Sequence, residues 1–232
     1  MKKVGFIGAY DKIDMIMSAA KILTLLRKKV LIIDATTNQK AKYLVPSITP
    51  TISYVTTFED IDIAVGFKTF EQIKQYLYIP ENEEVPYDIV LIDTDSSKAI
   101  EELNLHEAEK NFFVTSFDSY SLKRGLETLN VLEKPMELTK ILFAINIFKE
   151  DDDYLNFLSL EYKIRWDEYR IYFPMESEDI AEIHENQKAQ KIVFKRLTTQ
   201  YKEGLVYLTQ AIANDINETQ VRRVIKILEK GV

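Results

Sequence analysis

Polar residues that could contact a bound ligand follow several short apolar runs. The run Lys3–Ile7 leads into a tight loop that begins with Gly8 and Ala9 and contains Lys12. A loop between a first strand and a helix N-terminus is where α/β proteins bind phosphate, because free backbone N–H groups and the helix dipole favour an anion there. Later apolar runs end at Asp34, Asp93 and Asn146. The central question is whether the loop can still hold a phosphate.

The loop belongs to a strand–loop–helix–strand unit that spans residues 3–34. Apolar residues recur near the helical period after the loop, at Ile13, Ile16, Met17, Ala20, Leu23 and Leu26. A second apolar run over residues 29–34 then predicts a strand that is parallel to the first, joined to it by the helix.

The same alternation continues along the chain. Further strands are predicted over residues 51–57, 88–92, 111–116, 139–146 and 169–173. Helices are predicted over residues 68–78, 98–106, 119–132, 154–162, 178–187, 189–213 and 217–230. This pattern predicts an α/β fold, a doubly wound and mostly parallel sheet with helices on both faces. We expect one α/β domain over residues 1–213, followed by a C-terminal amphipathic helix within 214–232.

Composition narrows the class of protein. The chain has 232 residues, a formal net charge of −7 and no cysteine, so disulfides and thiolate metal sites are excluded. The negative charge argues against broad nucleic-acid binding. The start lacks the long apolar segment of a signal peptide, and no run of 18 apolar residues occurs, so we expect a cytoplasmic protein. Six glycines are few for a nucleotide-binding α/β protein.

Landmarks along nearly the whole chain resemble the ParA/MinD group of P-loop ATPases. They are the strand–loop–helix start, KKVLIIDAT, YDIVLIDTDSS, NFFVTSFDSYSLKRGLETLNVL, the strand ending at Asn146, and YFPMESEDIAEIHENQKAQ. Members of that group position plasmids, division machinery, pili and secretion assemblies. The resemblance implies the P-loop NTPase fold, protein partners and a homodimer.

The loop departs from the family pattern KGGVGKT, which aligns with Ile7–Ile13. Gly8 matches the first glycine and Lys12 matches the Walker lysine, but Ile7 replaces the signature lysine and Ala9 the second glycine. Asp11 replaces the third glycine, and Ile13 replaces the threonine whose hydroxyl holds Mg²⁺ in the family. Wherever the register is placed, Gly-Lys-Ser/Thr occurs nowhere in the chain.

Each replacement weakens a nucleotide site. Asp11 brings a carboxylate to the place of the phosphate charge, and Ile13 has no oxygen for Mg²⁺, which needs hard oxygen ligands. Asp11 and Asp14 also stand at a helix start, where the dipole favours carboxylates. We therefore expect them to occupy the anion site, with Lys12 paired to one of them. We expect no bound cofactor and no Mg²⁺, with ATP or ADP as the alternative.

The acidic residues at the strand ends match the family better than the phosphate loop does. By resemblance, Asp34 matches the acid that orients water or links to the metal, although its companion acid is Thr36 here. Asp93 matches the Walker B aspartate, and the alternative is that it caps the following helix. Asn146 matches an asparagine that reads the adenine ring. Asp34 and Asp93 are thus the candidate catalytic residues, and Gly8, Lys12 and Asn146 the candidate nucleotide contacts.

The last helix is basic and amphipathic. Its apolar stripe consists of Val221, Val224, Ile225 and Leu228. Arg222, Arg223, Lys226 and Lys230 lie on the other side. Some MinD-like relatives end in a helix that lies on an anionic membrane, which would make the protein peripheral to the membrane. The alternative is a helix packed on its own domain or on a partner.

These observations leave three hypotheses for the function. The first is a degenerate ParA/MinD-like protein that positions or scaffolds partners and has lost efficient ATP hydrolysis. The second is an active ATP-dependent switch with an unusual loop, in which Lys12, Asp34, Asp93 and Asn146 carry the chemistry. The third is a different enzyme on a related fold, although the chain has no nucleophile–base pair or metal cluster to support it.

Overall fold

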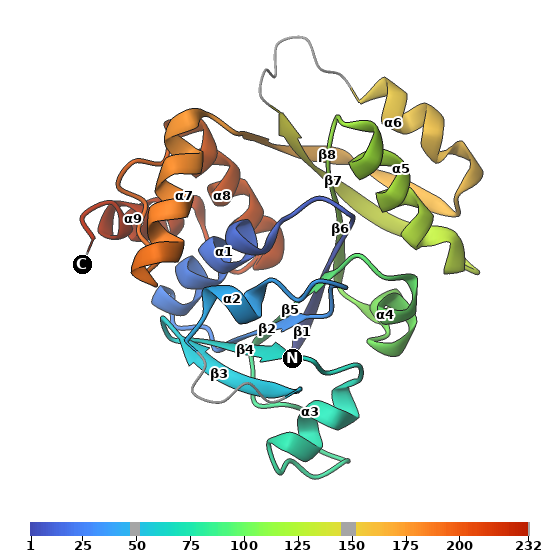
Figure 1. The fold of residues 1–232 in the computed structure, drawn as a ribbon, viewed down its shortest axis with the longest axis horizontal. Helices are drawn as coiled ribbons and strands as arrows, with labels where there is room; N and C mark the ends of the chain where they lie inside the picture. Colours follow the sequence, from blue (N-terminus) through green and yellow to red (C-terminus); the bar gives the residue numbers. More distant parts are fainter. Residues whose placement is uncertain (47–51, 145–151, 232) are drawn as a thin grey trace.

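A single mixed sheet forms the centre of the computed structural model, which describes residues 1–46, 52–144 and 152–231 (Figure 1). The strands are β1 (Lys2–Ile7), β2 (Val30–Asp34), β3 (Tyr54–Phe58), β4 (Ile61–Val65), β5 (Ile89–Thr94), β6 (Lys110–Ser116), β7 (Met136–Ala144) and β8 (Ile164–Pro174). Their order in the sheet is β3-β4-β2-β5-β1-β6-β7-β8. Only β3, at one edge, runs antiparallel to its neighbour among these strands.

Helices cover both faces of this sheet, so the predicted doubly wound α/β fold is confirmed. The helices are α1 (Ile13–Leu25), α2 (Ala41–Leu44), α3 (Phe70–Tyr76), α4 (Ser97–Glu102), α5 (Ser119–Glu127), α6 (Asp153–Leu158), α7 (Ser177–Ala189), α8 (Thr199–Ile212) and α9 (Glu218–Leu228). Helices α1, α7, α8 and α9 gather on one face, whereas α3, α4, α5 and α6 lie on the other (Figure 1). Among the described residues, no helix is both long and apolar enough to cross a membrane.

One strand of the structure is absent from the predicted elements, and one predicted helix is too long. Strand β4 was not predicted, yet it pairs with β2 and β3. The predicted helix over residues 189–213 is wrong in its first part, because α7 ends at Ala189 and Gln190 adopts a left-handed conformation (φ 48°). Ile192, Phe194 and Leu197 then enter the core from a non-helical segment before α8 begins.

Helix α9 packs against its own domain. Val221, Val224, Ile225 and Leu228 are at most 5% exposed and join the core that α1 and α8 also form. Its start is closed by a capping box between Asn217 and Gln220. A membrane contact through these four side chains would need them exposed, and in this structure they are buried.

Candidate functional site

The loop after β1 lies where three parallel strands end side by side. Gly8 follows β1 with φ 144°, and a Cβ there would stand 2.1 Å from the carbonyl oxygen of Val114. Only glycine fits so close a backbone approach. In the sheet register Asp34 of β2 stands opposite Asp93 of β5, and β5 also pairs with β1. The fold therefore brings the loop and both aspartates together at the carboxyl-terminal ends of these central strands.

Lys12 folds back into this loop. Its Nζ lies 2.7 Å from Asp93 Oδ1, and it donates a hydrogen bond of 2.8 Å to the carbonyl oxygen of Gly8. Lys12 and Asp93 are 3% and 2% exposed. The expectation that Lys12 pairs with Asp11 or Asp14 is wrong, because the carboxylate at the end of β5 is the one within its reach.

Asp93 is a deeply buried acid. Burial raises the pKa of its carboxyl to about 7; the Lys12 ammonium opposes this rise and the Asp34 carboxylate adds to it. The alternative that Asp93 caps the following helix is wrong, since Ser96 is the N-cap residue of α4.

Asp34 has both of its oxygens engaged by the chain that follows it. Oδ1 accepts hydrogen bonds from the backbone N–H and the hydroxyl of Thr36, at 3.1 and 2.6 Å. Oδ2 accepts one of 2.9 Å from the N–H of Ala41, at the start of α2. Asp34 is 1% exposed, so in this structure it acts as an anchor for residues 36–41.

The two carboxylates at the start of α1 have separate partners. Asp11 forms an ion pair with Lys40 at 2.5 Å, on the exposed side of the loop. Asp14 accepts hydrogen bonds of 3.0 Å at both of its oxygens from the side-chain amide of Gln187 on α7. Burial raises the pKa of Asp14 to about 6, although the Gln187 amide opposes the shift.

Neighbouring side chains narrow the space around the loop. The Tyr10 ring stacks on Phe143 of β7, with ring centroids 4.7 Å apart. Asp95, after β5, accepts hydrogen bonds from both the N–H and the hydroxyl of Thr37, at 2.8 and 2.9 Å. The cavity lined by residues 8–13 and Asp93 has about 140 Å³, below the roughly 300–1,000 Å³ of most ligand pockets. A neighbouring cavity of about 500 Å³ lies on the side of Asp11, Ile13 and Asp14, away from Asp93.

Sequence reasoning missed Lys40 and Gln187, which hold Asp11 and Asp14. No local pattern marks them, because they are 29 and 173 residues from their partners. Asn146, the predicted adenine contact, lies outside the described residues. Within the described part of the chain, no group of three or more His, Asp or Glu side chains could hold a metal ion.

Comparisons with known proteins identify the fold. No protein-family model matches the sequence, and no curated protein matches it. Among solved structures, a ParA family ATPase from Chlorobium tepidum is 16% identical over 90% of this chain and 97% of its own, with a TM-score of 0.57. A chain of the MinC:MinD cell division complex from Aquifex aeolicus is also 16% identical, over 97% and 96%, with a TM-score of 0.54. Apo McdA from Cyanothece is 10% identical over 92% and 100%, with a TM-score of 0.56. The chain therefore has the fold of the ParA/MinD ATPases.

Proposed function

We propose that this chain is a degenerate ParA/MinD-like protein that positions or scaffolds protein partners without efficient ATP hydrolysis. The observation that carries the proposal is the position of the Lys12 amine. It lies between Asp93 Oδ1 and the carbonyl oxygen of Gly8, and Lys12 and Asp93 are almost fully buried. The amine that would meet a phosphate thus already has two oxygen partners within the protein.

The residues around the loop do not fit a magnesium-bound nucleotide. Ile13 is 1% exposed and belongs to the core, and its apolar side chain supplies no oxygen for a hard cation. Asp11 places a carboxylate beside the loop, where charge stabilisation of the phosphates would require the opposite sign. Asp34 already accepts three hydrogen bonds from its own chain. No reaction step through a nucleotide follows from this arrangement.

Protein partners, and a second copy of the chain in particular, complete the proposal. One of the similar solved structures is a MinC:MinD cell division complex, which supports partner binding by this fold. We propose that the two copies meet at the end of the sheet where the loop lies. Tyr120 there is 69% exposed beside the loop and offers an aromatic contact. Because Lys12 already has its counter-ion, such a dimer would form without nucleotide.

Thermal unfolding with and without millimolar Mg-ATP tests the proposal. A ligand that binds only the native state at 100 times its Kd adds about 2.7 kcal/mol of stability. For a chain of this size, such a gain raises the Tm by roughly 2–4 °C per kcal/mol. We expect no shift for the natural sequence. Size-exclusion chromatography with light scattering should give the same mass with and without nucleotide.

A restored loop provides the matched comparison. The double variant Asp11→Gly/Ile13→Thr returns the glycine and the hydroxyl, so we expect it to gain a Tm shift with Mg-ATP. Adding Lys12→Met to that variant should abolish the shift. Each protein is compared with itself, so any loss of core stability from Ile13→Thr cancels.

The alternative function is an active ATP-dependent switch. It is favoured by the preserved juxtaposition of Gly8, Lys12 and Asp93, since Lys12 could exchange its ion pair for a phosphate. This alternative predicts a Tm shift with Mg-ATP for the natural sequence, lost in Lys12→Met, together with release of phosphate. Those results would overturn the proposal that the protein lacks efficient ATP hydrolysis.

A further inference from the structure

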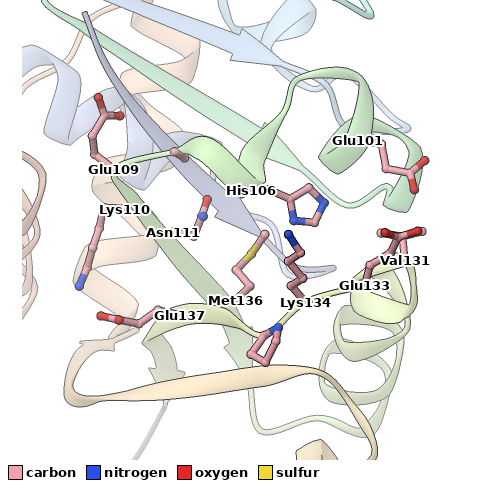
Figure 2. Close-up of a pocket in the computed structure, with 12 residues that line it drawn as sticks. Glu101, His106, Glu109, Lys110, Asn111, Val131, Glu133, Lys134, Met136 and Glu137 are labelled. Atoms are coloured by element: carbon pink, nitrogen blue, oxygen red, sulfur yellow. The ribbon is translucent and has the colours of Figure 1, made fainter.

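A second cavity lies at the opposite end of the sheet from the loop, where β6 and β7 begin (Figure 2). Its volume is about 600 Å³, within the range of small-ligand sites. The turn at Leu105–Glu107 borders it on one side, and residues 131–137 border it on the other. None of these residues contributes to the site around Lys12, so the cavity is a separate feature of the fold.

The centre of this cavity combines an apolar floor with two nitrogen groups that can donate hydrogen bonds. Figure 2 shows the Lys134 amine and the His106 ring pointing toward one another beside Met136. In the part of the chain that the structure describes, neither side chain forms a hydrogen bond or an ion pair. Met136 is 6% exposed and forms part of the apolar floor of the cavity. The Lys134 ammonium and a ring N–H of His106 can both donate hydrogen bonds to a carboxylate.

The remaining walls are acidic. Four glutamates line the cavity: Glu101, Glu109, Glu133 and Glu137. The two lysines in the lining are Lys134 and Lys110, and Lys110 is held by Asp167 at 2.7 Å. Glu109 accepts a hydrogen bond from the backbone N–H of Lys3, whereas Glu101 and Glu133 lie together on the side of Val131 (Figure 2). These two carboxylates face solvent and could meet an ammonium group.

Charge then selects the class of ligand. With His106 neutral, the lining carries a net charge of −2, so a simple anion would be repelled by the carboxylates around Lys134. A simple cation would bring its charge toward Lys134 itself. A molecule with a carboxylate at one end and an ammonium group at the other can pair with Lys134 and with the glutamates at the same time. The volume exceeds what one amino acid needs, and Met136, Pro135 and Val131 offer apolar contact.

We propose that this cavity binds a zwitterionic short peptide, with its C-terminal carboxylate between Lys134 and His106 and its N-terminal ammonium group at Glu101 and Glu133. The role of the site is recognition, with no covalent step. It is independent of the function proposed for the loop, since the cavity lies at the other end of the strands.

Isothermal titration with three matched probes tests the proposal. The dipeptide Leu-Ala carries both charges, N-acetyl-Leu-Ala lacks the ammonium group, and Leu-Ala amide lacks the carboxylate. We expect Leu-Ala to bind and each capped probe to bind at least about tenfold more weakly, because charge-assisted hydrogen bonds are the stronger ones. Absence of Leu-Ala binding at millimolar concentration, or equal binding of all three probes, would overturn the proposal.

Two variants locate the contacts. Lys134→Gln should weaken Leu-Ala binding about tenfold and leave the affinity of the amide-capped probe unchanged. Glu133→Gln should leave the affinity of the acetylated probe unchanged. Lys123→Gln, on the exposed side of α5, is the matched control and should change nothing. All three residues are exposed, so folding is preserved, which an unfolding curve checks. Binding unaffected by Lys134→Gln would contradict the assigned site.

Discussion

At the scale of single residues, the ion pair between Lys12 and Asp93 explains how the loop keeps its shape without a ligand. Taking two charges out of water is costly, and their attraction offsets that cost only when the contact is close and further hydrogen bonds satisfy the groups. The separation of 2.7 Å and the bond from Lys12 to Gly8 meet this requirement on the side of the lysine, whereas Asp93 Oδ1 has Lys12 as its close contact and no further hydrogen bond among the described residues. A loop that can close on itself needs no phosphate to be stable.

Asp14 leads to a prediction about pH. Its pKa is raised from 3.8 to about 6 in the folded protein, chiefly by burial. Between these values the native state binds more protons than the unfolded state, so this group's contribution to stability is present near pH 4 and lost as the pH rises through 6. Replacing it by asparagine should remove that loss and keep a polar contact for Gln187.

The measurement is the free energy of unfolding in urea at several pH values from 4 to 7. The natural sequence should lose stability across this window more steeply than Asp14→Asn, by up to about 1.4 kcal/mol per pH unit. Asp11→Asn is the control, because Asp11 is exposed. Parallel curves for the natural sequence and Asp14→Asn would show that Asp14 is ionised in the folded protein.

The arrangement of the site was partly predictable from the sequence. Asp34 and Asp93 end apolar strands, and parallel strands bring such ends together, which the register of β2 and β5 shows. The partner of Lys12 was not predictable, because several carboxylates lie near the loop and the helix start favoured Asp11 and Asp14. Choosing among them requires the depth of each group and the reach of the lysine. The roles of these residues in ligand binding stay predictions.

At the scale of elements, the sequence failed to predict β4 and the end of α7 because the residues usual in turns and helix ends are absent there. Strand β4 follows β3 through Glu59 and Asp60, which both adopt left-handed backbone conformations (φ 53° and 64°). Such two-residue turns usually contain asparagine and glycine, so this pair gives no warning of a hairpin. Gln190 ends α7 in a left-handed conformation that glycine most often supplies, which explains why the predicted helix ran on.

Helix α9 gives a test at this scale. Leu228 is 1% exposed in the core, whereas its neighbour Ile227 is 42% exposed. Leu228→Ala should lower the free energy of unfolding by about 2–5 kcal/mol, because it leaves a cavity. Ile227→Ala, the matched control, should stay within about 0.5 kcal/mol. Chemical denaturation measures both, and equally small effects would mean that the apolar stripe is not packed in solution.

At the scale of the whole molecule, the sheet separates two cores. One contains side chains of α1, α8 and α9, and the other contains those of α3 to α6. The only tryptophan, Trp166 on β8, packs against the second core, with its ring centroid 5.6 Å from that of Phe113. Trp166 fluorescence therefore reports on the face of the sheet that α9 does not touch.

Removal of residues 214–232 tests whether the C-terminal helix is part of the same folding unit. The four buried side chains of α9 contribute roughly 6–12 kcal/mol at about 1.5–3 kcal/mol each, which is comparable to the whole stability of a domain. Because the two cores share the strands of one sheet, the truncated chain should lose its Trp166 transition together with its helical circular dichroism. A truncated protein that keeps the Trp166 transition at the original urea midpoint would instead make α9 an independent appendage, free to leave the domain and meet a partner.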